Sequence, residues 1–144
     1  MICYAVIDTN VLVSALLSDK DDAATVQVVQ KIISGNIIPI YSYDIAHEYK
    51  IVLNRKKFKF SKENIDFLLN SIFHFGILFE PNFMDFSLPD MKDLPFYLVA
   101  FQNQDKNSFL VTGNIKHFPT EPFIVTPRQL INILNGNSTA NADV

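Results

Sequence analysis

The sequence lacks several features on which other classes of protein depend. Its 144 residues include one cysteine, Cys3, so no disulfide can form within the chain and one copy cannot assemble a zinc site from cysteines. No apolar run approaches the roughly 18 residues of a membrane span. The start, MICYAVIDTN, lacks the basic region and cleavage site of a signal peptide. We therefore expect a cytoplasmic protein without a membrane segment.

An excess of positive charge is also missing. The formal net charge of -3 argues against a large basic face as the means of binding nucleic acid, although it leaves open the binding of phosphate through a metal ion. Hydrophobic residues make up 49% of the chain and charged residues 19%, as in packed globular proteins. We expect one domain, residues 1–135, followed by a flexible tail, residues 136–144.

Short apolar segments alternate with amphipathic ones, which is the pattern of βαβ units around a parallel sheet. Five apolar segments predict strands at residues 3–7, 37–41, 76–80, 108–112 and 123–126. Three-and-four spacing of apolar residues predicts helices at residues 10–17, 22–35, 43–55, 61–75, 93–104 and 126–135. Ser61 is a candidate N-cap, and Thr126 with Pro127 signals another helix start. Strands this apolar should be covered on both faces.

Two acidic residues, Asp8 and Glu48, are candidates for a functional site because of their positions in the predicted fold. Asp8 directly follows the first predicted strand, at the edge where ligands bind in open parallel sheets. Alternatively, Asp8 or Thr9 only caps the next helix. Glu48 lies three residues after Ile45, on the apolar stripe of its helix, where a buried carboxylate needs a partner. That partner could also be Arg55 or a lysine in a salt bridge.

Two later loops bring polar residues to the same edge. Asp90 and Asp93 lie just before the helix turn that begins around Leu94 and Pro95, and a turn or a cap could explain each of them. Asn114 follows the fourth predicted strand. Clustered carboxylates raise one another's pKa unless a cation is present, so Asp8, Glu48 and Asp93 predict a metal site. Asp90 and Asn114 are further candidate ligands, and oxygen ligands favour Mg²⁺ or Mn²⁺.

Four strings, in this order, resemble the PIN-domain nucleases, the family that contains the VapC-type toxins of toxin-antitoxin pairs. They are IDTNVLVSALL, AHEYKIVL, PDMKDLPFYLVA, and LVTGNIKHFP followed by TPRQL. The last two are similar in particular to the branch described as toxin components of toxin-antitoxin systems. The resemblance runs from about residue 2 to residue 134.

The resemblance implies a three-layer α/β/α fold with a central parallel sheet of about five strands, and Mg²⁺- or Mn²⁺-dependent endoribonuclease activity. It also implies an antitoxin partner and often a homodimer. It carries the catalytic and metal-binding roles to Asp8, Glu48 and Asp93, with Asp90 at a nearby acidic position. Many PIN domains have a fourth aspartate where this chain has Asn114, whose uncharged amide would hold a second ion more weakly.

Other residues are candidates for contacts with RNA. Near the predicted metal site these are Thr9, Asn10, Thr112, Asn114 and His117, although His117 could equally be a structural turn residue. Further away, Arg55, Lys56 and Lys57 begin the run RKKFKF, whose cations could contact phosphates and whose aromatic rings could stack on bases. The alternative for this run is a solvated helix end. The surrounding phenylalanines are expected in the core, with an oligomer interface as the alternative for some of them: Phe58, Phe60, Phe67, Phe73, Phe75 and Phe79.

Two other functions fit parts of the pattern. An aspartyl-phosphate phosphatase also has an aspartate after its first strand, but the second acid expected two residues later is replaced by Asn10. A PIN-like module that has lost catalysis, and that only binds RNA or protein, would account for Asn114. The three retained acids favour the nuclease.

Overall fold

The computed structural model describes residues 1–136. In this part of the chain, five strands form one parallel sheet in the order β3-β2-β1-β4-β5. The strands are β1 (Cys3–Ile7), β2 (Ile37–Tyr41), β3 (Ile77–Leu78), β4 (Ser108–Val111) and β5 (Ile124–Val125). The helices are α1 (Thr9–Leu17), α2 (Ala24–Ile33), α3 (Tyr43–Leu53), α4 (Lys62–Phe75), α5 (Leu94–Gln102) and α6 (Pro127–Leu134), with the 3₁₀ turns η1 (Met91–Asp93) and η2 (Ile115–His117).

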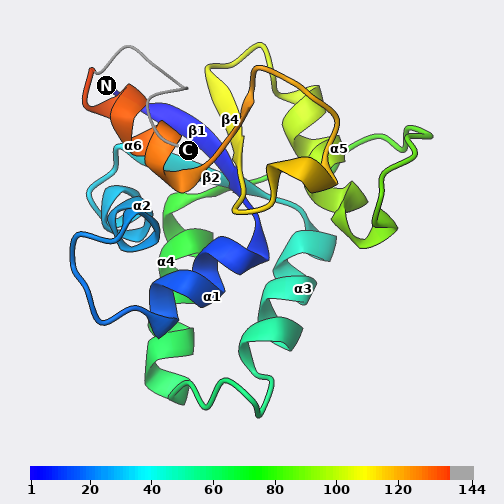
Figure 1. Ribbon diagram of the computed structural model, residues 1–144. Helices are drawn as coiled ribbons and strands as arrows, with labels where there is room; N and C mark the ends of the chain where they lie inside the picture. The colour runs from blue at the N-terminus through cyan, green and yellow to red at the C-terminus, as the bar shows by residue number, and fades with distance from the viewer. Residues whose placement is uncertain (137–144) are drawn as a thin grey trace.

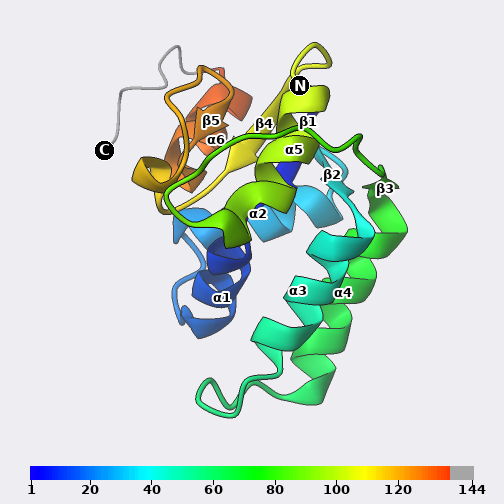
Figure 2. The ribbon, with the colours of Figure 1, turned by 90° about the vertical axis from the view of Figure 1, so that its right-hand side faces the viewer.

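Helices cover both faces of the sheet, so the predicted three-layer α/β/α fold is confirmed (Figure 1). Helix α5 packs against β1, β2 and β4, whereas α2 and α4 pack against β2 and α6 packs against β4. Figure 2 shows α5 in front of the sheet, with α3 and α4 side by side. Strand β1 lies at the centre, and its Cys3, Ala5, Val6 and Ile7 have no exposed surface.

All the predicted strands and helices exist, but the edge strands are shorter than expected. The strand predicted at residues 76–80 contains only Ile77 and Leu78, both more than 40% exposed. It pairs only with β2, and an edge strand has neighbours on one side alone. The segment predicted at residues 123–126 likewise contributes only Ile124 and Val125. Only Gly136 of the predicted tail, residues 136–144, falls within the described residues.

Local start signals were predicted correctly for two helices. The Ser61 hydroxyl accepts a hydrogen bond from the Asn64 backbone N–H at 3.1 Å. Thr126 and Gln129 form a reciprocal capping box, with Pro127 in the first turn of α6.

The expectation that the phenylalanines lie in the core is wrong for Phe67 and Phe75. Their side chains are 61% and 44% exposed. Phe60, Phe73 and Phe79 are partly buried and pack against the core. The apolar stripe of α4 is therefore wider than the surface that the sheet covers. None of the helices among residues 1–136 is long and apolar enough to cross a membrane.

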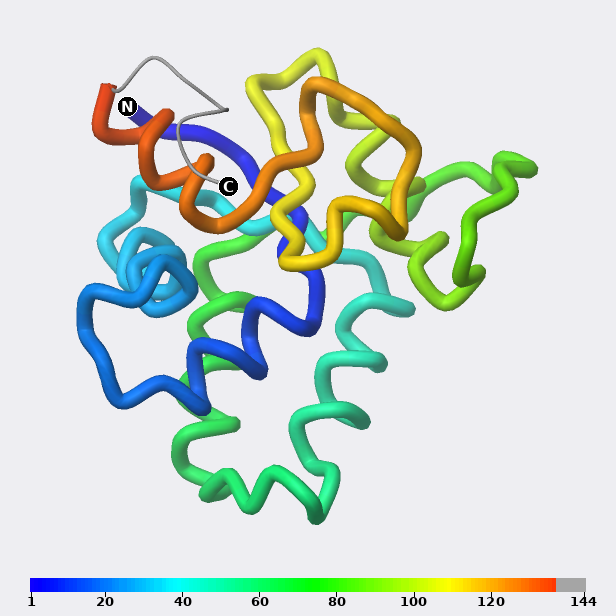
Figure 3. Tube along the Cα trace, in the orientation of Figure 1, coloured from blue at the N-terminus to red at the C-terminus, as the bar shows by residue number. Residues whose placement is uncertain are grey.

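The order of the strands positions the candidate site. The chain moves from β1 to β2 on one side, and β4 returns on the other side of β1. Open parallel sheets bind ligands at such a switch point, outside the carboxyl ends of the strands. Figure 3 shows the loop after β4 beside the bend where β1 leads into α1. In that bend, the Asp8 backbone N–H donates to the Val111 carbonyl at 2.9 Å.

Candidate active site at the carboxyl edge of the sheet

Asp8 stands where β1 leaves the sheet, and it is only 6% exposed. Its Oδ2 accepts hydrogen bonds from the Thr112 hydroxyl at 2.7 Å and from the Asn10 side-chain amide at 3.2 Å. Asp8 is the N-cap residue of α1, but its side chain makes no capping hydrogen bond. Capping therefore does not explain the aspartate. Its carboxylate is instead held by Asn10 from the first turn of α1 and by Thr112 from the loop after β4.

Glu48 reaches the same place from the second turn of α3. Its carboxylate is half-buried and accepts a short hydrogen bond from the Thr9 hydroxyl. Within residues 1–136, no lysine or arginine forms a salt bridge with it, so the salt-bridge alternative is wrong. Arg55 acts only through its charge, which slightly opposes the rise in the pKa of Glu48.

Asp93 lies at the end of η1, where α5 begins, and its side chain makes no capping hydrogen bond. Its Oδ2 is buried and has no hydrogen-bond partner in the described part of the chain. The His117 imidazole faces it, with Nδ1 3.5 Å from that oxygen. A buried carboxylate oxygen without a donor is costly, which makes Asp93 the least satisfied acid of the group.

Asp90 differs from Asp93 because its local structure explains it. Its Oδ1 accepts from the Lys92 backbone N–H at 3.0 Å and so caps η1. The turn explanation is confirmed for Asp90 and does not hold for Asp93. Asp90 still contributes negative charge, which raises the pKa of Asp93.

The acids influence one another electrostatically. Burial raises the pKa of Asp8, Glu48 and Asp93, and in each case a neighbouring carboxylate raises it further. The neighbour is Asp93 for Asp8, Asp8 for Glu48, and Asp90 for Asp93. The hydrogen bonds from Thr112 and Thr9 oppose these shifts without cancelling them. The site therefore carries more negative charge than its own donors balance.

This donor set suits a divalent cation, although the acids are not drawn into a closed ligand shell. Among residues 1–136, no group of three or more His, Cys, Asp or Glu side chains stands ready to hold an ion. The Asp93 Oδ2, which accepts no hydrogen bond, and the mutual repulsion of the acids are what an oxygen-bound cation would relieve. We conclude that the residues fit Mg²⁺ or Mn²⁺ in chemical type.

Hydrogen bonds fasten the loop after β4 to the start of α1. The Gly113 backbone N–H donates to Asn10 Oδ1 at 3.2 Å, and the Asn114 backbone N–H donates to the Thr112 hydroxyl at 3.0 Å. The Asn114 side chain is exposed beside this loop. Four of the predicted substrate-binding residues are thus brought together with Asp8: Thr9, Asn10, Thr112 and Asn114.

We call Asp8, Glu48 and Asp93 the acid cluster. The predicted basic segment does not lie in this cluster. Arg55, Lys56 and Lys57 are exposed on the loop between α3 and α4, at the far end of α3 (Figure 1). The rings of Phe58 and Phe60 stack on each other, with centroids 5.2 Å apart and planes 9° from parallel. The Lys57 ammonium lies 5.1 Å from the centre of the Phe58 ring. These groups form a separate surface.

Sequence reasoning missed one residue behind the site. The Tyr49 side chain is buried, and its hydroxyl donates to the Ile7 carbonyl at 2.5 Å, directly before Asp8. This bond ties α3, which carries Glu48, to the end of β1. The available signal was a tyrosine on the apolar stripe of α3, because a buried tyrosine hydroxyl needs a partner.

The protein is a three-layer α/β/α protein with a parallel sheet, and its acids cluster outside the carboxyl ends of β1 and β4. The sequence pattern of the PIN domain matches residues 4–116, and the chain belongs to the PIN domain family. PIN domains are generally nucleases and typically use divalent metal ions. Neither a curated protein nor a solved structure matches the chain.

Proposed function

We propose that the protein is a Mg²⁺- or Mn²⁺-dependent endoribonuclease in which Asp8, Glu48 and Asp93 bind the ion. The observation that carries the proposal is the buried Asp93 Oδ2, which accepts no hydrogen bond and faces only the His117 imidazole at 3.5 Å, beside two other acids whose pKa values are raised. The resemblance to ribonuclease members of the family supports RNA as the substrate. A divalent ion, when bound, activates water and neutralises charge that develops on a phosphodiester.

The surrounding residues would fix the acids in their ionised, ligand-ready orientation. Thr112 and Asn10 hold one oxygen of Asp8, and Thr9 holds Glu48. Hydrogen-bond donors of this kind orient the side chains that bind a metal ion and so affect the affinity for the ion. His117 lies between Asp93 and the solvent, with half of its side chain exposed. It is placed to contact a phosphate oxygen that approaches Asp93.

Cleavage of a mixed panel of structured and unstructured RNAs tests this proposal. Purified protein is incubated with Mn²⁺, with Mg²⁺ and with a chelator, and the Asp8→Asn protein is treated in the same way. We expect shortening of RNA that depends on the ion and disappears in the variant. Asp44→Asn is the matched control, because Asp44 is exposed in the first turn of α3. Cleavage that persists in Asp8→Asn would exclude the proposed site.

A binding module without catalysis is the second candidate. It is favoured by Asn114, which stands where many family members carry another acid, and by the lack of a closed ligand shell among residues 1–136. A binding module should hold RNA equally well with Mg²⁺ and with a chelator, and should never shorten it. A covalent phosphate trapped on Asp8 would instead support the phosphatase alternative.

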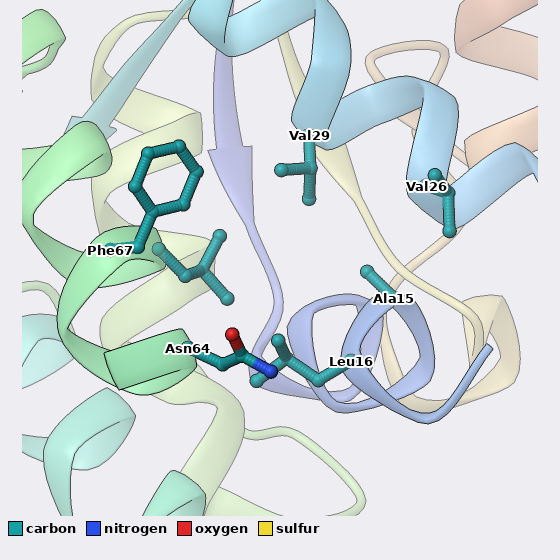
Figure 4. A pocket seen from close by; sticks show the side chains of 7 residues that line it. Ala15, Leu16, Val26, Val29, Asn64 and Phe67 are labelled. Carbon is teal, nitrogen blue, oxygen red and sulfur yellow. The ribbon is translucent and has the colours of Figure 1, made fainter. Parts of the chain in front are cut away.

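We further propose that the protein is the toxin of a type II toxin-antitoxin pair. The resemblance of the last two sequence strings supports this role. So does an apolar cleft of about 130 Å³ between α1, α2 and α4, whose lining includes Leu16, Val29 and Phe67 (Figure 4). A segment of a partner chain could cover such a cleft. Expression should arrest bacterial growth, and Asp8→Asn should abolish the arrest. Equal growth arrest by the unmodified protein and by Asp8→Asn would contradict the proposal.

Homodimer formation in the cytoplasm is the remaining part of the proposal. Large apolar side chains with more than half of their surface exposed, including Tyr43, Ile51 and Phe83, support self-association, because aromatic residues are enriched at protein interfaces. Light scattering of the purified protein measures the mass directly. A monomer at all concentrations would contradict this part without affecting the nuclease.

A further inference from the structure

A polar pocket adjoins the acids at Asn10, whose side chain donates to Asp8. Its volume is about 240 Å³, and its lining comes from the starts of α1, α2 and α6 and from the loop after β4. The polar lining residues are Asn10, Ser14, Thr25 and Asn114, and apolar surface comes from Val11 and Pro127. Among residues 1–136, no charged side chain lines this pocket. We call it the neutral pocket.

Asn10 connects the neutral pocket directly to the acids. Its amide nitrogen donates to Asp8 Oδ2 at 3.2 Å, and its amide oxygen accepts from the Gly113 backbone N–H at 3.2 Å. Both sides of this one amide are therefore engaged, which fixes the wall between the pocket and the acid cluster. A group that occupies the pocket lies one side chain away from Asp8.

Three other lining residues have hydrogen-bonding groups to spare. Among the described residues, the side chains of Ser14, Thr25 and Asn114 make no hydrogen bond to the protein. A hydroxyl can donate and accept, and a carboxamide offers two donors and an acceptor. The neutral pocket thus combines free donors and acceptors with apolar surface, and it offers no charge to balance.

A second, charged pocket shares the wall formed by Gly113 and Asn114. Its volume is about 430 Å³, and its lining includes Lys116, His117 and Thr126. His117 also lies 3.5 Å from Asp93, so this charged pocket, like the neutral pocket, borders the acids. The charged pocket suits a phosphate of an RNA strand, and the neutral pocket beside it suits a base of the same RNA strand.

The size of the neutral pocket also suits a base. A volume of about 240 Å³ is many times the 10–15 Å³ or so that one water needs. It is below the roughly 300–1,000 Å³ of pockets that enclose drug-sized ligands. A nucleobase is a flat, uncharged group with hydrogen-bonding edges and apolar faces, which matches the lining.

We propose that the neutral pocket binds one nucleobase of a single-stranded RNA, next to the phosphate held at the acid cluster, and that Ser14, Thr25 and Asn114 set the base preference. The proposal rests on the proposed function for the position of that phosphate. It adds a specificity site, made of neutral side chains, to a metal-dependent nuclease.

Binding without turnover tests the pocket independently of cleavage. Short RNAs that are identical except for one nucleotide, which carries each of the four bases or no base, are titrated onto the unmodified protein in a chelator. We expect one or two bases to bind more tightly than the abasic RNA. Thr25→Val keeps the shape of the side chain and removes the hydroxyl, and it should reduce the discrimination by about 3- to 10-fold.

Thr120→Val is the matched control, because Thr120 is exposed and lines neither pocket. It should leave the discrimination unchanged, and thermal unfolding should show that both variants are folded. If Thr25→Val proves unstable, Ser14→Ala provides the same test at an exposed position. Equal affinity for all the RNAs, including no binding by any of them, would overturn the proposal.

The two proposals fail separately. A base preference that depends on Thr25, in a protein that never cleaves RNA with any ion, would support the neutral pocket and refute the nuclease. Ion-dependent cleavage with no base preference at any position near the cut, and none in binding, would support the nuclease and refute the neutral pocket.

Discussion

The acid cluster and the basic loop between α3 and α4 are the two regions most suited to an RNA ligand, and they are built differently. The acids are partly or fully buried, and hydrogen bonds from Thr9, Asn10 and Thr112 hold two of them. In contrast, Lys56 and Lys57 are exposed and extend into solvent. The first region holds its charge in hydrogen-bonded positions, and the second presents its charge on an exposed loop.

This difference predicts separate roles for the two regions in catalysis and in RNA binding. Fixed, poorly solvated charge strengthens electrostatic interactions, and it is needed where a reacting group must be positioned. Exposed lysines contribute to association with phosphates in a way that depends on salt and little on geometry. We therefore expect changes in the acid cluster to alter catalysis and changes in the basic loop to alter affinity.

The largest effect is expected at Asp93. Asp93→Asn should lower the rate of RNA cleavage by about 100-fold or more, because it removes a charged ligand from the proposed metal site. The same change relieves repulsion from Asp90 and Asp8, so the metal-free variant should unfold at a higher temperature than the unmodified protein. Cleavage assays and calorimetry measure the two effects.

A loss of both activity and stability in Asp93→Asn would show instead that the carboxylate is structural. His117→Ala provides a comparison, because it removes the imidazole 3.5 Å from Asp93 Oδ2 and keeps the acid. It should leave metal affinity largely intact. Asp44→Asn again serves as the exposed control.

The next effect concerns the hydrogen bond from the Tyr49 hydroxyl to the Ile7 carbonyl, which lies behind the acids. Tyr49→Phe leaves the buried Ile7 carbonyl without its donor, and it should lower the free energy of unfolding by about 1–3 kcal/mol. Because this bond ties α3 to the end of β1, the variant should also lose activity. Tyr43→Phe is the control, since Tyr43 is 66% exposed on the same helix. Chemical denaturation gives the energies, and equal values for both variants would exclude the role of Tyr49.

The third effect is a dependence of stability on pH. Burial and neighbouring charge raise the folded-state pKa of Asp8, Glu48 and Asp93 above the ordinary values of 3.8 and 4.5. The folded state thus binds protons more tightly than the unfolded chain, and the resulting stabilisation is full below the unfolded pKa. It is lost as the pH rises through the folded pKa.

The contribution of these acids to the stability of the metal-free protein should therefore be larger at about pH 4, close to the unfolded pKa values, than at about pH 8, as thermal unfolding would measure. Asp93→Asn should reduce this difference. Saturating Mg²⁺ should raise stability at the higher pH, because a ligand that binds only the folded state stabilises it. Stability that rises steadily with pH in the absence of metal would contradict the electrostatic account of the site.

The fold could be predicted from sequence because its signals are local and repeated. The apolar runs of β1 and β2 ended where predicted, and Ser61 and Thr126 marked their helices correctly. The limits of β3 could not be predicted, because an edge strand ends where its neighbour stops pairing. Phe67 was misplaced because periodicity identifies an apolar face of α4 and not what covers it.

The candidate site was predictable only in part, for a similar reason. Asp8 follows a strand, so the sequence alone placed it at the correct edge. The hydrogen bond from Thr9 to Glu48 spans 39 positions, and the bond from Thr112 to Asp8 spans 104, and no local pattern encodes such pairs. The neutral pocket, which needs the starts of three helices at once, could not be foreseen from any single segment.

The smallest effect is expected in the basic loop. Lys56→Ala should weaken RNA binding only a few-fold, about equally for all sequences, and should lower the slope of log affinity against log salt by about 1. Lys62→Ala is the matched control, because its ammonium already donates to Asp66 at 2.8 Å. If Lys56→Ala instead changed the rate at saturating RNA and left affinity intact, the loop would belong to the catalytic site. The distinction between fixed and exposed charge would then fail.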